Sequence, residues 1–391
     1  MTIMLQLNTG SIFTIMKYYL IAGEASGDLH GSNLIREIKL RDANAEIRCW
    51  GGNKMEAAGA TLVKNYKDLA FMGFAEVLMN LRTILGNMHF CKHDITQYQP
   101  DIIVMIDFPG FNLPIAKWAK PLGYKIAWYI SPQVWAWKEK RVKDIKATVD
   151  KMLCILPFEK PWFKKWDYEV EYVGHPLIEV ISDAKKAGPK LNFSTAKDSH
   201  GNDKKIVALL PGSRKQEILK KLPVMLEVAK RMPEYHFIVA QAPGQEDAFY
   251  EPLLQPYPNV SSVKNGTYDL LMQTTAALVT SGTATLETGL FGVPQVVCYK
   301  ANPISYQIAK RIIKIKYISL VNLIMDKPIV TELIQHEMNV DRVFDELTNL
   351  LQNDYVANRM KQDYEDLWNL LAAGGNASAT SAEIIVRMVG T

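Results

Sequence analysis

The sequence predicts an α/β protein built from two doubly wound parallel sheets, one in each half of the chain. Short apolar runs alternate with longer amphipathic stretches along most of the 391 residues. These runs are apolar on both faces, which is typical of strands in a parallel sheet covered by helices. One polar stretch interrupts the alternation, and the length suits two domains of about 150 residues or more. We therefore expect the ligand to bind in a cleft between the halves.

The first half is expected to begin at residue 16. Residues 1–15 lack the cationic start and the cleavage site of an export signal, so they are predicted to be a disordered extension. Residues 16–181 form the first predicted domain. Its expected strands cover residues 17–22, 46–50, 102–106, 125–130, 152–156 and 170–173.

The second half repeats this rhythm after a linker. Residues 182–204 are polar, contain Gly and Pro and show no periodicity, so they are the predicted linker. The second domain is expected to cover residues 205–370, and a C-terminal helix residues 371–391. Its strands are expected at 205–210, 236–240, 277–280 and 295–299. In such Rossmann-like sheets ligands bind beyond the carboxyl ends of the strands, so the residues that follow each strand are the informative ones.

Composition excludes several classes of protein. A net charge of +4 is too small over this length to indicate a nucleic-acid-binding protein. The four cysteines are scattered without a CxxC pair, which indicates neither disulfides nor structural zinc. No run approaches the roughly 18 apolar residues that cross a bilayer. We expect a cytoplasmic protein, free or on a membrane surface.

A glycine-rich turn follows the first strand. Gly23, Glu24, Ser26 and Gly27 let the backbone approach a ligand closely, and a helix is expected to open near Asp28. The glycine spacing does not match the GxGxxG pattern of dinucleotide-binding proteins. The alternative is a tight structural turn in which Ser26 or Asp28 caps the helix.

Asp107 follows five apolar residues at the carboxyl end of another strand. Partial desolvation there raises the pKa of a carboxyl group, which makes Asp107 a candidate general base near neutral pH. The alternative is that Asp107 only bonds to the following turn while Asn112 caps the next helix. The sequence leaves open whether Asp107 acts directly or through His30.

Two turns in the second half suit a phosphorylated ligand. Arg214 lies at the start of a helix, where a guanidinium can bind phosphate. Ser281, Gly282 and Thr283 present small side chains and backbone N–H groups at another helix start. Glu287, one turn further on, can accept hydrogen bonds from both ribose hydroxyls. The alternative is a capped helix with a solvated glutamate.

Together these residues predict a nucleotide-sugar donor in the second domain that faces a lone carboxylate in the first. That is the layout of a GT-B glycosyltransferase. The sequence has no DxD-type metal motif at the expected place, so we expect protein groups to neutralise the diphosphate, with neither metal nor cofactor.

From residue 16 onward the chain resembles the lipid-A-disaccharide synthase family. The resemblance is carried by ordered motifs, namely GEASGD at 23–28, the turn from Asp107 to Asn112, SPQVWAW at 131–137, LPFE at 156–159, VGHP at 173–176, LPGSR at 210–214, SGT at 281–283 with Glu287, and SLVNL at 319–323. Two positions differ from the family's usual pattern: Gly110 stands where an acid is common, and Val321 where a proline is common.

The resemblance implies an inverting GT-B enzyme that transfers 2,3-diacylglucosamine from UDP to the 6-hydroxyl of 2,3-diacylglucosamine 1-phosphate, giving lipid A disaccharide and UDP. It implies that Asp107 is the base, that Arg214 and the Ser281 loop hold the diphosphate, that Glu287 holds the ribose and that Asn322 belongs to the donor site. It also implies peripheral association with the inner face of the cytoplasmic membrane.

Acylated substrates call for an apolar surface. Residues 71–90 predict a helix that is apolar over much of its circumference and that could bind acyl chains or enter the membrane interface; the alternative is a buried core helix. Basic residues around 160–166 and 300–316 could contact anionic headgroups, or form solvated faces. The oligomeric state is not predicted. The competing functions are another GT-B transferase or 2-epimerase acting on UDP-N-acetylglucosamine, and a nucleotide-sugar-binding protein without catalysis.

Overall fold

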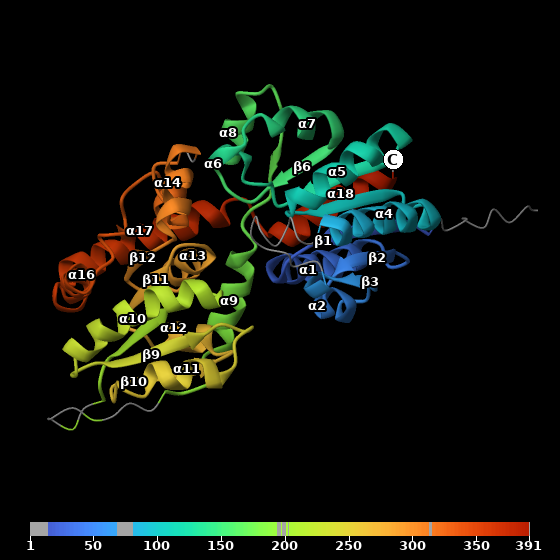
Figure 1. Cartoon of the computed structure of the whole chain (residues 1–391). Coiled ribbons are helices and arrows are strands. Elements are labelled where there is room, and N and C mark those ends of the chain that lie inside the picture. The colour runs from blue at the N-terminus through green and yellow to red at the C-terminus, as the bar shows by residue number, and fades with distance from the viewer. Residues whose placement is uncertain are drawn as a thin grey trace, which may run out of the picture.

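The computed structural model describes residues 15–68, 81–193, 197, 201, 203–312 and 315–390. These residues form two α/β domains, each with a parallel sheet between layers of helices (Figure 1). The predicted fold class is therefore confirmed. Residues 1–14 of the predicted extension and residues 71–80 of the predicted apolar helix lie outside the described residues. None of the described helices combines the length and apolar character needed to cross a bilayer.

Within the described residues, the first domain holds a seven-stranded parallel sheet of order β3-β2-β1-β4-β5-β6-β7. Its strands are β1 (Lys17–Ala22), β2 (Glu46–Gly51), β3 (Thr61–Asn65), β4 (Ile102–Ile106), β5 (Lys125–Tyr129), β6 (Lys151–Cys154) and β7 (Glu171–Tyr172). Its helices are α1 (Ala25–Arg41), α2 (Asn53–Ala57), α4 (Leu81–Tyr98), α5 (Pro109–Ala119), α6 (Val134–Trp137), α7 (Arg141–Thr148) and α8 (Glu159–Lys164), with 3₁₀ turns at Tyr66–Asp68 and Lys120–Leu122.

The described part of the second domain holds a six-stranded parallel sheet of order β10-β9-β8-β11-β12-β13. Its strands are β8 (Ile206–Leu210), β9 (His236–Gln241), β10 (Val260–Lys264), β11 (Ala276–Thr280), β12 (Gln295–Tyr299) and β13 (Thr331–Ile334). The remaining helices are α9 (Leu177–Ala187), α10 (Lys215–Arg231), α11 (Asp247–Leu254), α12 (Thr267–Leu271), α13 (Thr283–Leu290), α14 (Pro303–Ile312), α15 (Leu320–Met325), α16 (Val340–Gln352), α17 (Asp354–Ala372) and α18 (Ala377–Gly390).

The central strands are buried along their whole length. Every residue of β4, β8 and β11 is buried, because helices cover both faces of each sheet. Strands β3, β10 and β13 were not predicted. Each of them lies at the edge of its sheet and is largely half-exposed, so it lacks a continuous apolar run.

Strand order reverses once in each sheet, between β1 and β4 in the first and between β8 and β11 in the second. Ala22 pairs with Ile106 at the carboxyl end of the first of these strand pairs, and Leu210 pairs with Val279 at that end of the second. The glycine turn therefore follows β1 and Asp107 follows β4, and these two strands are adjacent. The loops that carry Arg214 and Ser281 likewise follow the adjacent strands β8 and β11, so the candidate residues lie at the two topological switch points.

The two domains are joined by more than a linker. Helix α9 extends to Ala187, inside the segment predicted to be the linker, and its Leu177 and Ile181 pack into the core of the second domain. Helix α18 returns to the first domain and packs against α1 (Figure 1). Its Ala382 and Ile385 belong to the same buried cluster as strands β1 and β4.

Candidate active site

Asp107 lies at the switch point of the first sheet, on a backbone held from two sides. Its N–H donates to the carbonyl of Tyr129 at 3.2 Å, and its carbonyl accepts from Asn112 Nδ2 at 2.7 Å. Asp107 and Phe108 both adopt left-handed conformations, with φ of 43° and 51°. For a bulky residue such as Phe108 this conformation is strained, and such strain clusters at functional sites.

Asn112 does not cap the helix, contrary to the alternative considered from the sequence. Helix α5 begins at Pro109, three residues earlier, and Phe108 occupies its N-cap position. Asn112 is fully buried inside the helix, where its amide holds the carbonyl of Asp107. A polar residue that resembled a cap therefore positions the candidate base.

The carboxyl group of Asp107 is half-buried, and burial raises its pKa to about 6. The nearby carboxylate of Glu24 contributes to this raised pKa, while a backbone hydrogen bond from Phe108 opposes the rise. At neutral pH the group is ionised yet more basic than an ordinary aspartate, as a general base requires. His30 is not among the groups that shift it, and burial lowers the pKa of His30 itself to about 4.

The glycine turn begins a helix earlier than predicted. Helix α1 starts at Ala25, with Glu24 at the N-cap and no side chain capping it. Ser26 is exposed. Asp28 is buried and accepts hydrogen bonds from the N–H groups of Lys54 and Met55, so it caps α2 instead of α1. The alternative in which Ser26 or Asp28 caps α1 is therefore wrong, because Asp28 caps α2 and no side chain caps α1.

Gly23 has a packing role that connects the turn to Asp107. A Cβ atom on Gly23 would lie 2.4 Å from the ring of Phe108, so only glycine lets that ring pack on the turn. Gly27 similarly leaves room for Ala22, whose Cβ would lie 3.0 Å from a Cβ at Gly27. Glu24 is exposed beside this packing, close enough to shift the pKa of Asp107.

A cavity of about 330 Å³ lies at the switch point of the second sheet. It is enclosed by the segments that follow β8, β9 and β11 and by the start of α12. Its lining includes the predicted residues Ser281, Gly282, Thr283 and Glu287, together with Gly212, Ser213, Glu217, Thr267 and Thr280. We call it the donor cavity.

The Ser281 loop lines this cavity and is held in place by a hydrogen bond to a neighbouring segment. Ser281 Oγ donates to the carbonyl of Ile318 at 2.7 Å. Gly282 has a φ of 137°, which favours glycine, and α13 begins at the exposed Thr283. The first N–H groups of α13 therefore adjoin the cavity, where they can bind an anion.

Glu287 is not a solvated glutamate. It is half-buried, and its Oε1 accepts a hydrogen bond from Tyr268 Oη at 2.8 Å. Burial raises the pKa of Glu287, and the hydrogen bond from Tyr268 acts in the opposite direction. The carboxylate is thus fixed at the cavity wall with one oxygen engaged by Tyr268.

Two predicted residues lie beside the donor cavity without lining it. Arg214 is exposed at the N-cap of α10, with its Nη1 3.4 Å from Oε1 of Glu217, a lining residue. Asn322 is buried, and its amide bonds to the backbone of Ile329 and Val330 and to Glu332. In this structure the hydrogen bonds of Asn322 hold α15 against residues 329–332.

Glu332 was missed by the sequence reasoning. Its Oε1 and Oε2 accept hydrogen bonds from the N–H groups of Ser319 and Ile318, and Oε1 also accepts from Asn322. Because Ile318 in turn accepts from Ser281, Glu332 and Asn322 support the Ser281 loop. Val321, which stands where a proline is common in the family, lies in α15 and is fully buried. The only signal in the sequence was a lone acid within an apolar strand.

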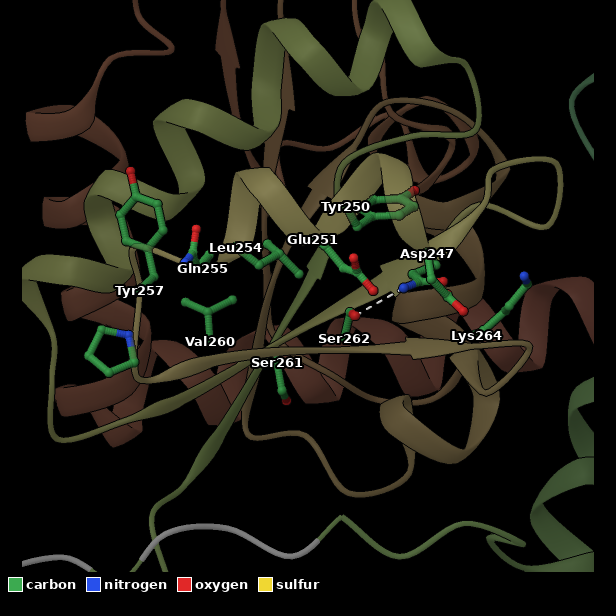
Figure 2. A pocket seen from close by; sticks show the side chains of 12 residues that line it. Asp247, Tyr250, Glu251, Leu254, Gln255, Tyr257, Val260, Ser261, Ser262 and Lys264 are labelled. Carbon is green, nitrogen blue, oxygen red and sulfur yellow. Dashed lines mark hydrogen bonds between the residues drawn. The ribbon is translucent and has the colours of Figure 1, made fainter.

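A second, more open cavity of about 680 Å³ lies between α11 and β10 (Figure 2). Gln241 lines both cavities, and it donates to Ser262 Oγ at 3.0 Å. Asp247, Glu251 and Lys264 also line the second cavity. Across the described residues, no group of His, Cys, Asp and Glu side chains is arranged to hold a metal ion.

Sequence comparison decides the family. Residues 18–386 match the model of the lipid-A-disaccharide synthetase family. The lipid-A-disaccharide synthase of Geobacter metallireducens is 37% identical over 378 residues, which cover 95% of this chain and 97% of that protein. That of Syntrophus aciditrophicus is 36% identical over 364 residues, covering 92% and 94%. The chain belongs to the lipid-A-disaccharide synthase family.

Members of this family are glycosyltransferases of lipid A biosynthesis, and the predicted family and enzyme class are confirmed. Solved structures agree on the fold. The kitacinnamycin glycotransferase aligns with a TM-score of 0.64 at 18% identity, covering 96% of this chain and 99% of that one. The UDP-GlcNAc 2-epimerase of Neisseria meningitidis, bound to UDP-GlcNAc, aligns with a TM-score of 0.62 at 12% identity, covering 96% and 100%. The chain thus has the GT-B fold, which synthases and epimerases share, while the sequence likeness is to the synthases.

Proposed function

We propose that this chain joins UDP-2,3-diacylglucosamine to 2,3-diacylglucosamine 1-phosphate by an inverting, metal-independent displacement. The observation that carries this proposal is the division of chemistry between the domains. A carboxylate whose pKa is raised to about 6 follows β4 in the first domain, and a cavity beside the first N–H groups of α13 lies beyond β8 and β11 in the second.

In the proposed step, Asp107 takes the proton of the acceptor's 6-hydroxyl while that oxygen attacks the anomeric carbon of the donor. The bond from this carbon to the diphosphate oxygen breaks, and UDP leaves with the electron pair. A single displacement inverts the anomeric centre, and Asp107 afterwards releases its proton to solvent. Asp107 is the one base that this step needs.

The donor cavity is proposed to hold UDP. The N–H groups at the start of α13 and the guanidinium of Arg214 stabilise the leaving diphosphate, and Glu287 accepts from the ribose hydroxyls. These groups are the proposed alternative to a metal ion. The UDP-GlcNAc bound to the Neisseria epimerase supports a UDP-sugar in this fold.

We assign the acceptor and its acyl chains to the first domain, residues 16–181, and the UDP-sugar to residues 205–370. Association with the inner face of the cytoplasmic membrane is part of this proposal. Lys160, Lys164, Lys310 and Arg311 are exposed and suit anionic headgroups. Phe163, in contrast, is fully buried and belongs to the core.

The test is release of UDP from UDP-2,3-diacylglucosamine with and without the acylated acceptor. We expect release only when the acceptor is present, with a disaccharide of inverted anomeric configuration, and we expect chelation of divalent cations to leave the rate unchanged. Release without acceptor, or epimerisation of UDP-N-acetylglucosamine, would overturn the assigned reaction. Loss of activity on chelation would overturn its metal independence alone.

A further inference from the structure

Lys221 is buried directly below the donor cavity. Among the described residues it is the one lysine whose side chain is buried, with 3% of its surface exposed. It lies on α10, a helix whose other lysines are exposed. A buried ammonium group is costly unless it is paired and hydrogen-bonded.

The surroundings of Lys221 place its ammonium against the floor of the cavity. Nζ donates a hydrogen bond to Thr280 Oγ1 and lies 3.8 Å from Oε2 of Glu217. It lies 3.4 Å from where a Cβ atom on Gly212 would stand. Thr280, Glu217 and Gly212 all line the donor cavity.

The hydrogen bond to Thr280 fixes the direction in which its hydroxyl can donate. An ammonium group donates hydrogen bonds and accepts none, so Thr280 Oγ1 must be the acceptor. The hydroxyl hydrogen of Thr280 is then left for another acceptor. Since Thr280 ends β11 and lines the cavity, a phosphate oxygen bound there is a suitable acceptor.

Charge in this cluster favours the same ligand. Arg214 and Lys221 both contact Glu217, with distances of 3.4 Å and 3.8 Å between nitrogen and carboxylate oxygen. These two cations outweigh the Glu217 carboxylate on this side of the cavity, while Glu287 lines the cavity separately. Burial lowers the pKa of Lys221, and the Glu217 carboxylate acts in the opposite direction, which helps to keep the ammonium charged.

We propose that Lys221 is a positioning residue for the leaving diphosphate, which places a fixed positive charge under its oxygens and turns the Thr280 hydroxyl toward them as a donor. This inference rests on the proposed binding of UDP in the donor cavity. It adds to that site a buried cation that does not line the cavity.

The experiment compares UDP with uridine, which lacks the phosphates, on the full chain. Lys221→Met removes the charge and keeps the apolar stem; Lys230→Met, an exposed lysine on the same helix, is the matched control. We expect Lys221→Met to weaken UDP binding by about tenfold, measured by calorimetry, and to leave uridine binding, measured by NMR titration, unchanged. Lys230→Met should change neither.

A structural role would give a different result. If Lys221 only stabilises the fold, Lys221→Met lowers the unfolding temperature and affects UDP and uridine equally, which overturns the inference. Unchanged UDP affinity in a folded Lys221→Met protein overturns it as well. Wild-type protein that binds no UDP would instead overturn the proposed function and this inference together.

A second pair of variants serves if Lys221→Met does not fold. Thr280→Val removes the hydroxyl and should weaken UDP binding about tenfold, while Thr280→Ser keeps the hydroxyl and should restore it. Where Lys221→Met does fold, the two losses should not add in the double variant, because both substitutions act on the same hydrogen bond. Wild-type affinity in Thr280→Val contradicts the inference.

Discussion

The two switch points have the same topology and opposite chemistry. At β1 and β4 in the first domain, the loops present a carboxylate on a left-handed backbone, beside a phenylalanine ring that packs on Gly23. At β8 and β11 in the second domain, the loops present small residues and helix N–H groups above a buried ammonium. The sheet fixes where a site forms, and the loop residues decide whether it accepts a proton or binds an anion.

The largest effect is expected when Asp107, the carboxylate at the switch point of the first domain, is replaced. Asp107→Asn should lower turnover by at least about a hundredfold while UDP still binds. Asparagine tolerates the φ of 43° but cannot accept the proton. Burial raises the pKa of Asp107 in the folded chain, so ionisation at neutral pH opposes folding, and the variant should unfold at the same or a higher temperature. A variant with more than a tenth of wild-type turnover would contradict the assignment of the base.

The next largest effect is expected at the switch point of the second domain, where Arg214 lies beside the donor cavity. Arg214→Ala should weaken UDP binding by about tenfold to a hundredfold, as expected for loss of a charge-assisted contact. Arg231→Ala removes an exposed guanidinium from the other end of α10, where it pairs with Asp341 at 2.7 Å, and serves as the control. Calorimetric titration with UDP distinguishes them. Equal affinities for the two variants would remove Arg214 from the site.

A smaller effect tests how the glycine turn supports Asp107. Gly23→Ala forces the ring of Phe108 to move, since the new Cβ would lie 2.4 Å from it, and turnover should fall by about tenfold. Gly110→Ala is the matched control in the same motif, because nothing lies within 4 Å of its Cβ position. Steady-state rates at saturating substrate compare the two. Similar rates in both variants would show that Phe108 does not position the base.

The smallest effect concerns pH. Because the Glu24 carboxylate contributes to raising the pKa of Asp107 to about 6, Glu24→Gln should move the acidic limb of kcat/KM to lower pH. The shift should be less than about one pH unit, since Glu24 is exposed and screened by solvent, and it should shrink as salt is added. A limb that stays in place at low salt would show that Glu24 does not act on Asp107.

The central strands and the loops after them could be predicted because their determinants are local. Strands such as β4 and β8 are buried on both faces, so their sequences read as continuous apolar runs. Edge strands such as β10 are half-exposed or exposed at every residue and give no such signal.

Features that depend on contacts between distant residues could not be predicted. Asp28 caps a helix that begins 25 residues later, and Gly23 makes room for the ring of Phe108, which lies 85 residues further on. Lys221 has the sequence context of a surface lysine on an amphipathic helix, and its hydrogen bond to Thr280, 59 residues further along the chain, appears only in the folded structure. The roles of such residues follow from tertiary packing, which periodicity does not encode.

Helix α18 has a consequence for how the chain folds during its synthesis. Ala382 and Ile385 complete the buried cluster around β1 and β4, although more than 270 residues separate them from β4. Because α18 is synthesised last, the whole second domain leaves the ribosome before the buried cluster of the first domain is complete. Until then the face of α1 that α18 covers stays open to water, so truncation near residue 377 should make the amino-terminal half prone to aggregate.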